Sequence, residues 1–466
     1  MTDRDYKDFL VSKRLVVPAA GRNISRDLLH PALFPFQRDL VHWSLRKGRA
    51  ALFSDTGTGK SFMQLEWARH ACDPFEREGA SRTLILAPLA VAQQTVAEGR
   101  KWGYTVTYCR SGLDAPREGT VITNYEMMSH FDPAQFGAVV LDESSILKSF
   151  EGKTRTALIE RFQETPMRLC CTATPAPNDI AEIANHAEFL GHMTRAEMLA
   201  AFFVHDDAGW RLKGHARSAF YRWLASWGMS VRKPSDINEG YDDSGYNLPP
   251  LVIEPHFIEV ETPPSDRLFQ VGLKGVTERA SVRRDTLVER VQHAAALIRT
   301  ESDRPWLAWV GLNDEGRLLQ REIPTSLLVE GSQSPDEKAQ HMGDFSAGRA
   351  RILITKPSVS GFGMNWQHCN RMVFVGLSDS YESYYQCIRR CWRYGQRNPV
   401  VAHIVLSDRE QDIYANVLRK EQEASILAAE LIGNVREFER EELAPATARA
   451  DYIATAAMVL PSWMRE

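Results

Sequence analysis

Short apolar runs alternate along the chain with longer stretches in which apolar residues recur at helical spacing. The short runs are rich in β-branched residues, and this alternation is typical of parallel sheets covered by helices. Ten runs are predicted to be buried strands, five in the first half of the chain (50–53, 83–87, 120–123, 138–141 and 168–172) and five in the second half (306–310, 326–329, 352–355, 372–375 and 400–405). The pattern predicts an α/β protein with two tandem parallel-sheet lobes.

The stretch between the two series, residues 188–250, is rich in aromatic and basic side chains and is predicted to form helices appended to the first lobe. Residues 241–250 have the Gly, Asp, Asn and Pro content of a linker, and residues 251–261 are predicted to be a strand entering the second lobe. The predicted domains are an N-terminal extension (1–29), a first lobe (30–190), a helical appendage with the linker (191–250), a second lobe (251–420) and a C-terminal helical tail (421–466). Within the tail, residues 422–431 have amphipathic helical spacing.

The length of 466 residues is too great for one ordinary core, and 44% hydrophobic and 25% charged residues are typical of a globular protein. The sequence has no apolar run long enough to span a bilayer, and charges near its start argue against a signal peptide. The seven cysteines are odd in number and lack C-x-x-C spacing, which favours reduced thiols and argues against a zinc site. We therefore expect a soluble cytoplasmic protein with no membrane partner.

A phosphate-binding turn is predicted where Ser54-Asp-Thr-Gly-Thr-Gly-Lys-Ser61 follows the first strand and precedes a helical stretch. Glycines let successive backbone N–H groups point inward, the following helix presents its positive end, Lys60 supplies a charge for the β- and γ-phosphates, and Ser61 can ligate Mg²⁺. The predicted nucleotide-binding residues of this turn are Thr56, Gly57, Thr58, Gly59, Lys60 and Ser61. Ser54 stands where Gly or Ala is usual, and a chance Gly-Lys-Ser loop is the alternative interpretation.

A pair of acids, Asp142 and Glu143, ends the apolar run 138–141. A carboxylate beside a phosphate-binding turn can hold the magnesium shell, while its neighbour orients the attacking water. We assign the metal to Asp142 and the water to Glu143. An acidic helix N-terminus is the alternative for an isolated Asp-Glu pair.

A cluster of arginines lies in the segment 386–396, QCIRRCWRYGQ. Arg390 and Arg393 are three residues apart and share one face if the segment is helical. From a second lobe they could reach across a cleft and stabilise charge on a transferring phosphoryl group. The alternative is a solvated basic face, against which the interleaved Ile388, Trp392 and Tyr394 suggest partial burial.

Taken in order, these segments resemble the motifs of superfamily-two (DEAD/DEAH-like) helicases. The segments are Phe36-Gln37, the Lys60 turn, 86–89 (LAPL), Asp142-Glu143, Thr172-Ala-Thr174, 360–365 (SGFGMN) and 386–396. Residues 361–365 and 393–396 look most like the Swi/Snf-like, chromatin-remodeller branch in its compact bacterial or phage form, and the resemblance spans about residues 30–410. It implies two RecA-like lobes, ATP and Mg²⁺ as cofactors, and a bacterial or phage-infected host cell.

The resemblance also implies roles for single residues. Gln37 would read the adenine, Thr172 and Thr174 would couple hydrolysis to lobe movement, and Gly361 and Gln386 would lie at the closing interface, with Gly361 at the nucleotide and Gln386 in the catalytic set. Surfaces around Pro88, Gln93, Asn124 and Gly361 would follow a nucleic-acid backbone.

Some positions depart from that pattern or have a plainer interpretation. Ser144-Ser145 replace the commoner Ala-His or Ala-Asp, and Thr172 replaces a more usual serine. Gln37 could equally be a surface glutamine, and Thr172 and Thr174 ordinary strand-end residues. In the appendage, Trp210, Trp223 and Trp227 could stack on bases, although core packing is favoured, and Lys213, Arg217, Arg232 and Lys233 could contact phosphates or form a solvated face.

The sequence thus predicts an ATP-hydrolysing nucleic-acid motor, a helicase or translocase, acting on DNA more readily than RNA and on duplex by preference. The net charge of −4 gives no globally basic signature, but a motor needs only a local basic groove. One alternative is an ATP-switched nucleic-acid-binding module with little turnover. Another is the motor subunit of a larger defence, replication or modification complex, with protein partners that supply targeting.

Overall fold

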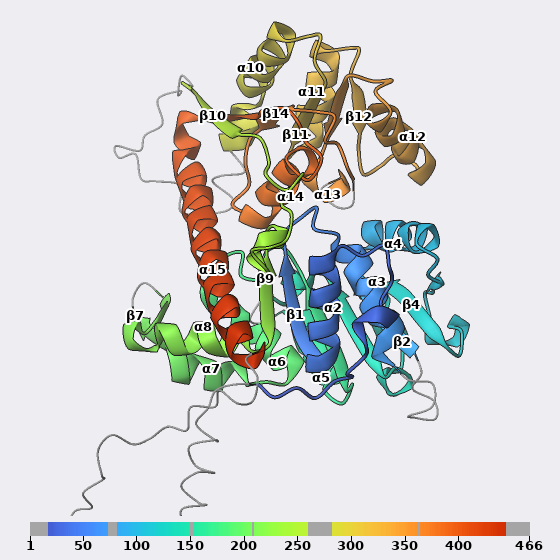
Figure 1. Cartoon of the computed structure of the whole chain (residues 1–466). Coiled ribbons are helices and arrows are strands. Elements are labelled where there is room, and N and C mark those ends of the chain that lie inside the picture. The colour runs from blue at the N-terminus through green and yellow to red at the C-terminus, as the bar shows by residue number, and fades with distance from the viewer. Residues whose placement is uncertain are drawn as a thin grey trace, which may run out of the picture.

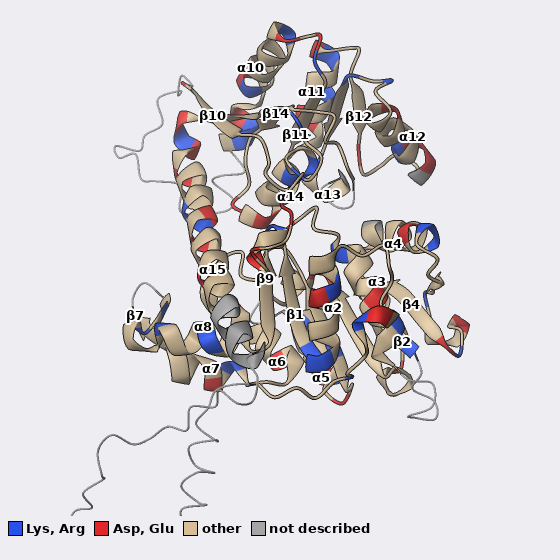
Figure 2. Ribbon diagram, viewed as in Figure 1, with Lys and Arg blue, Asp and Glu red and all other residues tan. Residues whose placement is uncertain are grey.

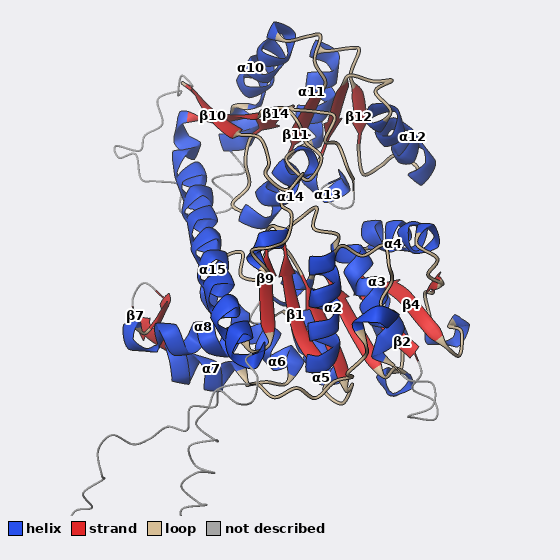
Figure 3. Cartoon of the chain, in the orientation of Figure 1, coloured by secondary structure: helices blue, strands red, loops and turns tan. Residues whose placement is uncertain are grey.

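The computed structural model describes residues 17–72, 82–148, 152–206, 209–259, 282–360 and 364–443. In these ranges the chain forms two α/β lobes, one above the other in Figure 1, with a long helix running beside both. Each lobe is built on a sheet covered by helices (Figure 3). None of the helices in the described ranges is long and apolar enough to cross a membrane.

The first lobe is built on a seven-stranded parallel sheet with the order β3-β4-β2-β5-β6-β1-β9. Its strands are β1 (Arg49–Ser54), β2 (Arg82–Ala87), β3 (Val106–Tyr108), β4 (Gly119–Asn124), β5 (Ala138–Asp142), β6 (Met167–Cys171) and β9 (Gly228–Val231). The covering helices include α2 (Pro35–Lys47), α3 (Lys60–Ala71), α4 (Leu89–Lys101), α5 (Lys153–Phe162) and α6 (Ile183–Leu190). The central strands β2, β5 and β6 are buried throughout, as expected of a parallel sheet covered on both faces.

The second lobe is built on a six-stranded parallel sheet with the order β10-β15-β14-β11-β13-β12. Its strands are β10 (Leu251–Ile258), β11 (Trp306–Val310), β12 (Leu327–Val329), β13 (Ile352–Thr355), β14 (Arg371–Val375) and β15 (Val400–Ser407). Its helices are α10 (Leu287–Thr300), α11 (Asn313–Glu322), α12 (Pro335–Ser346), α13 (Pro357–Ser360) and α14 (Tyr381–Cys391). Two apolar clusters, one on each face of the sheet, form its core.

The predicted fold class, two tandem RecA-like lobes with an appendage, is confirmed. Each of the ten predicted runs coincides with a strand of the expected sheet, although the runs 168–172 and 326–329 each extend one residue beyond the strand. The appendage is less purely helical than predicted. Besides α7 (Arg195–Phe202) and α8 (Arg217–Ala225) it contains an antiparallel hairpin, β7 (Phe203–Asp206) with β8 (Gly209–Leu212). It also supplies β9, which pairs with β1 at the edge of the first-lobe sheet. All four residues of β9 are buried.

The tryptophans of the appendage pack mainly in the protein interior. Trp223 and Trp227 are 2% and 0% exposed within the first-lobe core. Trp223 stacks on Phe202, and Trp227 makes edge-to-face contacts with Trp223 and Phe53. Trp210 is half-buried beside His205. The favoured interpretation as core packing is confirmed for Trp223 and Trp227, which are inaccessible to a base.

A single long helix, α15 (Gln411–Leu443), connects the two lobes. It begins inside the range predicted for the second lobe, and the predicted amphipathic segment 422–431 is part of it. Ile413 and Val417 are buried in the core of the second lobe, whereas Leu427 and Leu431 are buried in the core of the first. Figure 1 shows the helix leaving the second lobe and running down to α8 and β9. One helix therefore contributes to both cores.

Candidate nucleotide-binding and catalytic site

The predicted phosphate-binding turn lies between β1 and α3, and Lys60 is the first residue of the helix. Gly57 and Gly59 have φ angles of 88° and 85°, in the left-handed region that glycine adopts readily. A Cβ on Gly59 would lie 2.2 Å from Nε2 of Gln37, and one on Gly57 would lie 3.1 Å from Cβ of Tyr394. Both glycines are therefore required by backbone conformation and by the close approach of neighbouring side chains.

Ser54, the departure from the usual pattern, supports this turn from beneath. Its hydroxyl is hydrogen-bonded to Oγ1 of Thr58, which also donates to the backbone oxygen of Asp55 at 2.6 Å. Ser54 and Thr58 are 0% and 1% exposed. The Thr58 side chain is thus folded into the turn and does not line the cleft.

Gln37 lies on α2 against this turn and is 3% exposed. Its Nε2 donates to the backbone oxygen of Thr58 at 2.8 Å, and its Oε1 accepts from the backbone N–H of Phe34 at 2.9 Å. The alternative of a surface glutamine is wrong, because both amide atoms are used and the residue is buried. Contact between Gln37 and an adenine stays a prediction.

The two acids lie at the carboxyl end of β5. Oδ1 of Asp142 accepts from Nε2 of Gln64 at 2.7 Å and from the backbone N–H of Glu143 at 3.0 Å. Glu143 has a φ of 53°, the only positive φ of a non-glycine residue in the described part of the chain. Such a conformation costs about 1–3 kcal/mol and is found where surrounding contacts enforce it. Here it accompanies a carboxylate that lines the cleft beside Lys60.

Burial raises the pKa of Asp142 and of Glu143, and the ammonium of Lys60 opposes the rise in both cases. Nζ of Lys60 lies 3.5 Å from Oε1 of Glu143 and makes no hydrogen bond to any described residue. A buried ammonium without hydrogen-bond partners lies next to a glycine turn and two desolvated carboxylates. A phosphate group would supply the missing partner of the ammonium, and Mg²⁺ would supply a positive charge for the carboxylates. The residues present therefore fit a magnesium nucleotide.

The second lobe reaches this cluster through α14. Nε2 of Gln386 lies 3.5 Å from Oε2 of Glu143, and Oε1 of Gln386 accepts from Nη2 of Arg390 at 2.9 Å. Arg390 also donates to the backbone oxygen of Met364 at 3.1 Å, and Arg393 to the same oxygen at 3.4 Å. Burial lowers the pKa of Arg393 to about 10, which leaves it charged at neutral pH. The structure therefore brings the predicted arginine pair to the acids of the first lobe, and charges of both signs meet where α14 approaches that lobe (Figure 2).

Polar contacts that the sequence did not predict also join the lobes. Arg389 forms an ion pair with Asp55 of the phosphate-binding turn, and the hydroxyl of Tyr385 donates to the same carboxylate. Ser145 and Lys148 both contact Glu382 at the start of α14. Arg389 was not among the predicted site residues, because it does not share the helical face of Arg390 and Arg393. The unusual Ser145 therefore has a partner across the interface.

Replacing Asp55 by alanine should destabilise the closed arrangement of the lobes. The side chains of Arg389 and Asp55 are 6% and 12% exposed, so the change leaves a buried guanidinium without its ion-pair partner. Breaking such a pair from one side costs about 3–5 kcal/mol. Urea denaturation should show a lower free energy of unfolding for Asp55→Ala. Asp206→Ala, which breaks the exposed pair with Arg211, should cost at most about 1 kcal/mol; equal losses would contradict the prediction.

A cleft of about 430 Å³ contains most of the predicted site. It is lined by Gln37, Thr56, Gly57, Gly59, Lys60, Ser61, Asp142, Glu143, Arg390 and Arg393. Aromatic rings also border it, among them Trp102, stacked on Phe62 at 4.4 Å, and Tyr394, 4.8 Å from Tyr246. Apolar walls with a few converging polar groups are typical of a ligand site. Gly361 lies outside the described residues.

The residues predicted to couple or to contact nucleic acid have mixed placements. Thr172 and Thr174 are buried, and the N–H of Thr174 donates to Oγ1 of Thr172 at 3.1 Å. Asn124 is 5% exposed and hydrogen-bonded to Tyr108, whereas Gln93 is exposed on α4. The basic residues of the appendage have protein partners: Lys213 with Ala200, Arg217 with Glu430, Arg232 with Ser425 and Lys233 with Asp243.

Comparisons with known proteins show which folds and domains the chain resembles. Residues 288–395 match the Helicase conserved C-terminal domain, while no curated protein matches the sequence. Among solved structures, the chain is similar to S. cerevisiae Dbp5 bound to RNA and ADP BeF3, with 13% identity over 85% of this chain and 93% of that one, and a TM-score of 0.52. It is also similar to the Sulfolobus solfataricus SWI2/SNF2 ATPase core in complex with double-stranded DNA, with 16% identity over 91% and 98% of the two chains and a TM-score of 0.42.

The protein thus shares its two-lobed fold with Dbp5. The part of the second lobe that matches the helicase conserved C-terminal domain extends from α10 to Gly395, just after α14.

Proposed function

We propose that this protein is an ATP hydrolase that couples hydrolysis between its lobes to movement on DNA, in duplex form. The proposal is carried by one observation, a continuous series of side chains that crosses the cleft from the phosphate-binding turn to the second lobe. The series runs Lys60, Glu143, Gln386, Arg390, with separations of 3.5, 3.5 and 2.9 Å. Hydrolysis in such a site depends on lobe closure, because its groups come from both lobes.

Each residue of the series has a chemical task. Lys60 and the N–H groups of the turn would hold the phosphates, and Mg²⁺ bound by Ser61 and Asp142 would offset their charge. Glu143 would orient and polarise the attacking water. Arg390 and Arg393 would stabilise the charge that develops on the transferred phosphoryl group, and Gln386 would hold Arg390 beside Glu143.

The choice of DNA rests on the resemblance of residues 361–365 and 393–396 to the Swi/Snf-like branch. RNA is the competing substrate, since the fold is shared with an RNA-bound protein. The alternative of a switch with little turnover rested on Ser54, Ser144 and Ser145. Each has a structural partner, Thr58, His186 and Glu382 respectively, so these substitutions fit within a complete hydrolytic site.

Duplex DNA is expected to stimulate ATP hydrolysis by the full chain more than single-stranded DNA or RNA does. The measurement is the steady-state rate of phosphate release with each nucleic acid and with none, at several salt concentrations. Apparent DNA affinity should fall as salt rises, because binding to phosphates releases counterions. Phosphate release that remains in Lys60→Ala measures any contaminating ATPase. Stimulation by RNA alone would replace the DNA assignment, and no turnover under any condition would replace the motor by the switch or by a partner-dependent subunit.

A further inference from the structure

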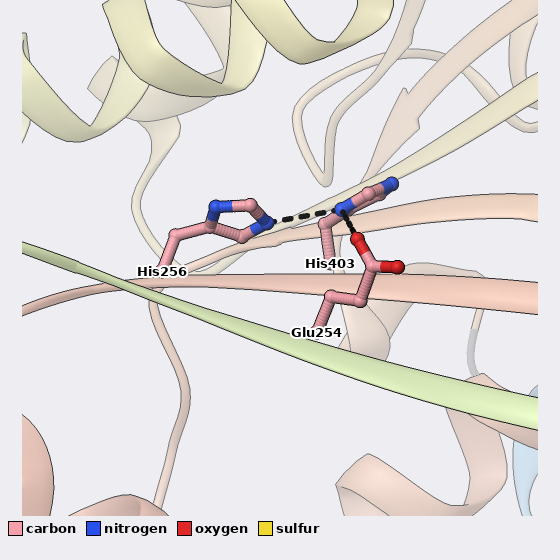
Figure 4. Close-up of side chains that lie close together, drawn as sticks. All are labelled: Glu254, His256 and His403. Atoms are coloured by element: carbon pink, nitrogen blue, oxygen red, sulfur yellow. Dashed lines mark hydrogen bonds and ion pairs between the residues drawn. The ribbon is translucent and has the colours of Figure 1, made fainter.

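Two histidines and a glutamate converge on the sheet of the second lobe, away from the interlobe cleft. Glu254 and His256 lie on β10, and His403 lies on the neighbouring strand β15. Glu254 is the register partner of His403, and residues two apart on a strand share a face, so all three side chains project from the same side of the sheet. Figure 4 shows their ligand atoms directed at one another.

The spacing of these atoms matches that of ligands around one metal ion. Nδ1 of His403 lies 3.0 Å from Nε2 of His256 and 3.2 Å from Oε2 of Glu254, and all three atoms lie within 4.8 Å of one another. Ligands at the usual bond lengths of tetrahedral zinc are about 3.3 Å apart. The ligand atoms of the third pair, His256 and Glu254, lie within 4.8 Å of one another and would move to the same spacing around a bound ion.

Hydrogen bonding alone satisfies this cluster poorly. A neutral imidazole nitrogen either donates one proton or accepts one, yet Nδ1 of His403 has two close partners. If it carries a proton, Glu254 and His256 must share it; if it does not, its lone pair faces a carboxylate. A cation between the three atoms would satisfy all of them at once.

Neighbouring side chains fix the position of the cluster, and one side of it is open to solvent. The ring of Trp306 stacks on that of His403 with centroids 5.6 Å apart. His293 of α10 lies with its ring 5.0 Å from His256, and its buried Nε2 has no hydrogen-bond partner within the described ranges. His403 is buried, whereas the side chain of Glu254 is 47% exposed, which opens one side to solvent. Arg371 lies nearby, but Glu301 forms an ion pair with it.

We propose that Glu254, His256 and His403 form a zinc site, with His293 placed to supply a fourth ligand. Two imidazoles with a carboxylate are a donor set that suits Zn²⁺, whereas Mg²⁺ prefers oxygen ligands alone. The metal would fasten β10, the edge strand that follows the interlobe linker, to β15 and α10. The cysteine spacing argued against zinc, but this site uses no cysteine.

The test is a titration of the full chain, stripped with chelator and free of nucleotide, with Co²⁺ as the probe. We expect one equivalent to give the intense visible absorption of tetrahedral Co²⁺, without thiolate charge-transfer bands, and Zn²⁺ to displace it. His256→Ala and His403→Ala should each weaken binding by at least about tenfold, taking the 10–100-fold typical of losing a supporting residue as a lower limit. His341→Ala, in α12 of the same lobe, should bind as the unmodified chain does.

Glu254→Gln should fold whether or not the site binds a metal, because the side chain of Glu254 is half-exposed. It too should lose affinity. Absence of Co²⁺ binding, thiolate bands, or unchanged binding in Glu254→Gln and both histidine variants would each overturn the proposal. ATP hydrolysis is not measured, and Asp142→Asn should leave the titration unchanged, so this result is independent of the proposed motor activity.

Discussion

Replacing Glu143 by glutamine is expected to lower kcat for ATP hydrolysis by about 10²–10⁴-fold, the contribution typical of a positioned general base. The amide retains the size of the carboxylate but cannot accept a proton from water. It also removes the charge that lies 3.5 Å from Nζ of Lys60, so ATP should bind at least as well. The measurements are single-turnover phosphate release and the binding of a fluorescent ATP analogue.

Gln64→Ala is the matched control for a disturbed acid pair. It removes the 2.7 Å hydrogen bond to Asp142 but leaves the Glu143 carboxylate in place. Its rate loss should be much smaller than that of Glu143→Gln. Turnover by Glu143→Gln within tenfold of the unmodified protein would show that another group activates the water.

Replacing Arg390 by alanine is expected to lower kcat by about 10³–10⁵-fold, the range measured for arginines that stabilise phosphoryl transfer. The guanidinium is 5% exposed and lies beside Gln386, so its charge is held where water does not screen it. Arg390→Lys should recover little, because the single nitrogen of an ammonium cannot occupy the separate positions from which Nη2 and Nη1 donate to Gln386 and Met364. The measurement is kcat at saturating ATP and DNA.

Arg397→Ala is the control for loss of positive charge, since Arg397 directly follows the segment 386–396 and is exposed. Its kcat should be unchanged. If Arg390→Ala lowered ATP affinity and left kcat unaltered, Arg390 would bind ATP in the ground state and would not stabilise the transferring phosphoryl group.

Much of the fold could be predicted because its strands are buried on both faces. Such strands appear as continuous apolar runs, and the runs at 306–310 and 352–355 coincide with β11 and β13. The strands that were not predicted lack that signal. β3 is half-buried and only three residues long, and β9 follows a helix rich in aromatic residues, so its tryptophan neighbours suggested continued helix.

The candidate site was predictable where a local pattern carries the chemistry, as in the turn ending at Ser61 or the acids after β5. Contacts that depend on how the two lobes pack against each other could not be predicted from the sequence. Nothing in the local sequence pairs Asp55 with Arg389, 334 positions apart, or Ser145 with Glu382. Thr58 was predicted to bind the nucleotide because it lies in the motif, and the sequence did not indicate that its side chain is hydrogen-bonded to Ser54.

The connecting helix α15 limits how the lobes can separate. Because Val417 is fixed in one core and Leu431 in the other, with a single helix between them, the lobes are held at a fixed distance on that side. The cleft can widen on the opposite side, where α4 lies, if α15 bends between its two anchored ends, whereas a straight separation must pull Leu427 and Leu431 into water at about 1.5–3 kcal/mol each. Opening of the cleft would therefore change the angle between the lobes, while α15 keeps their separation constant on its own side.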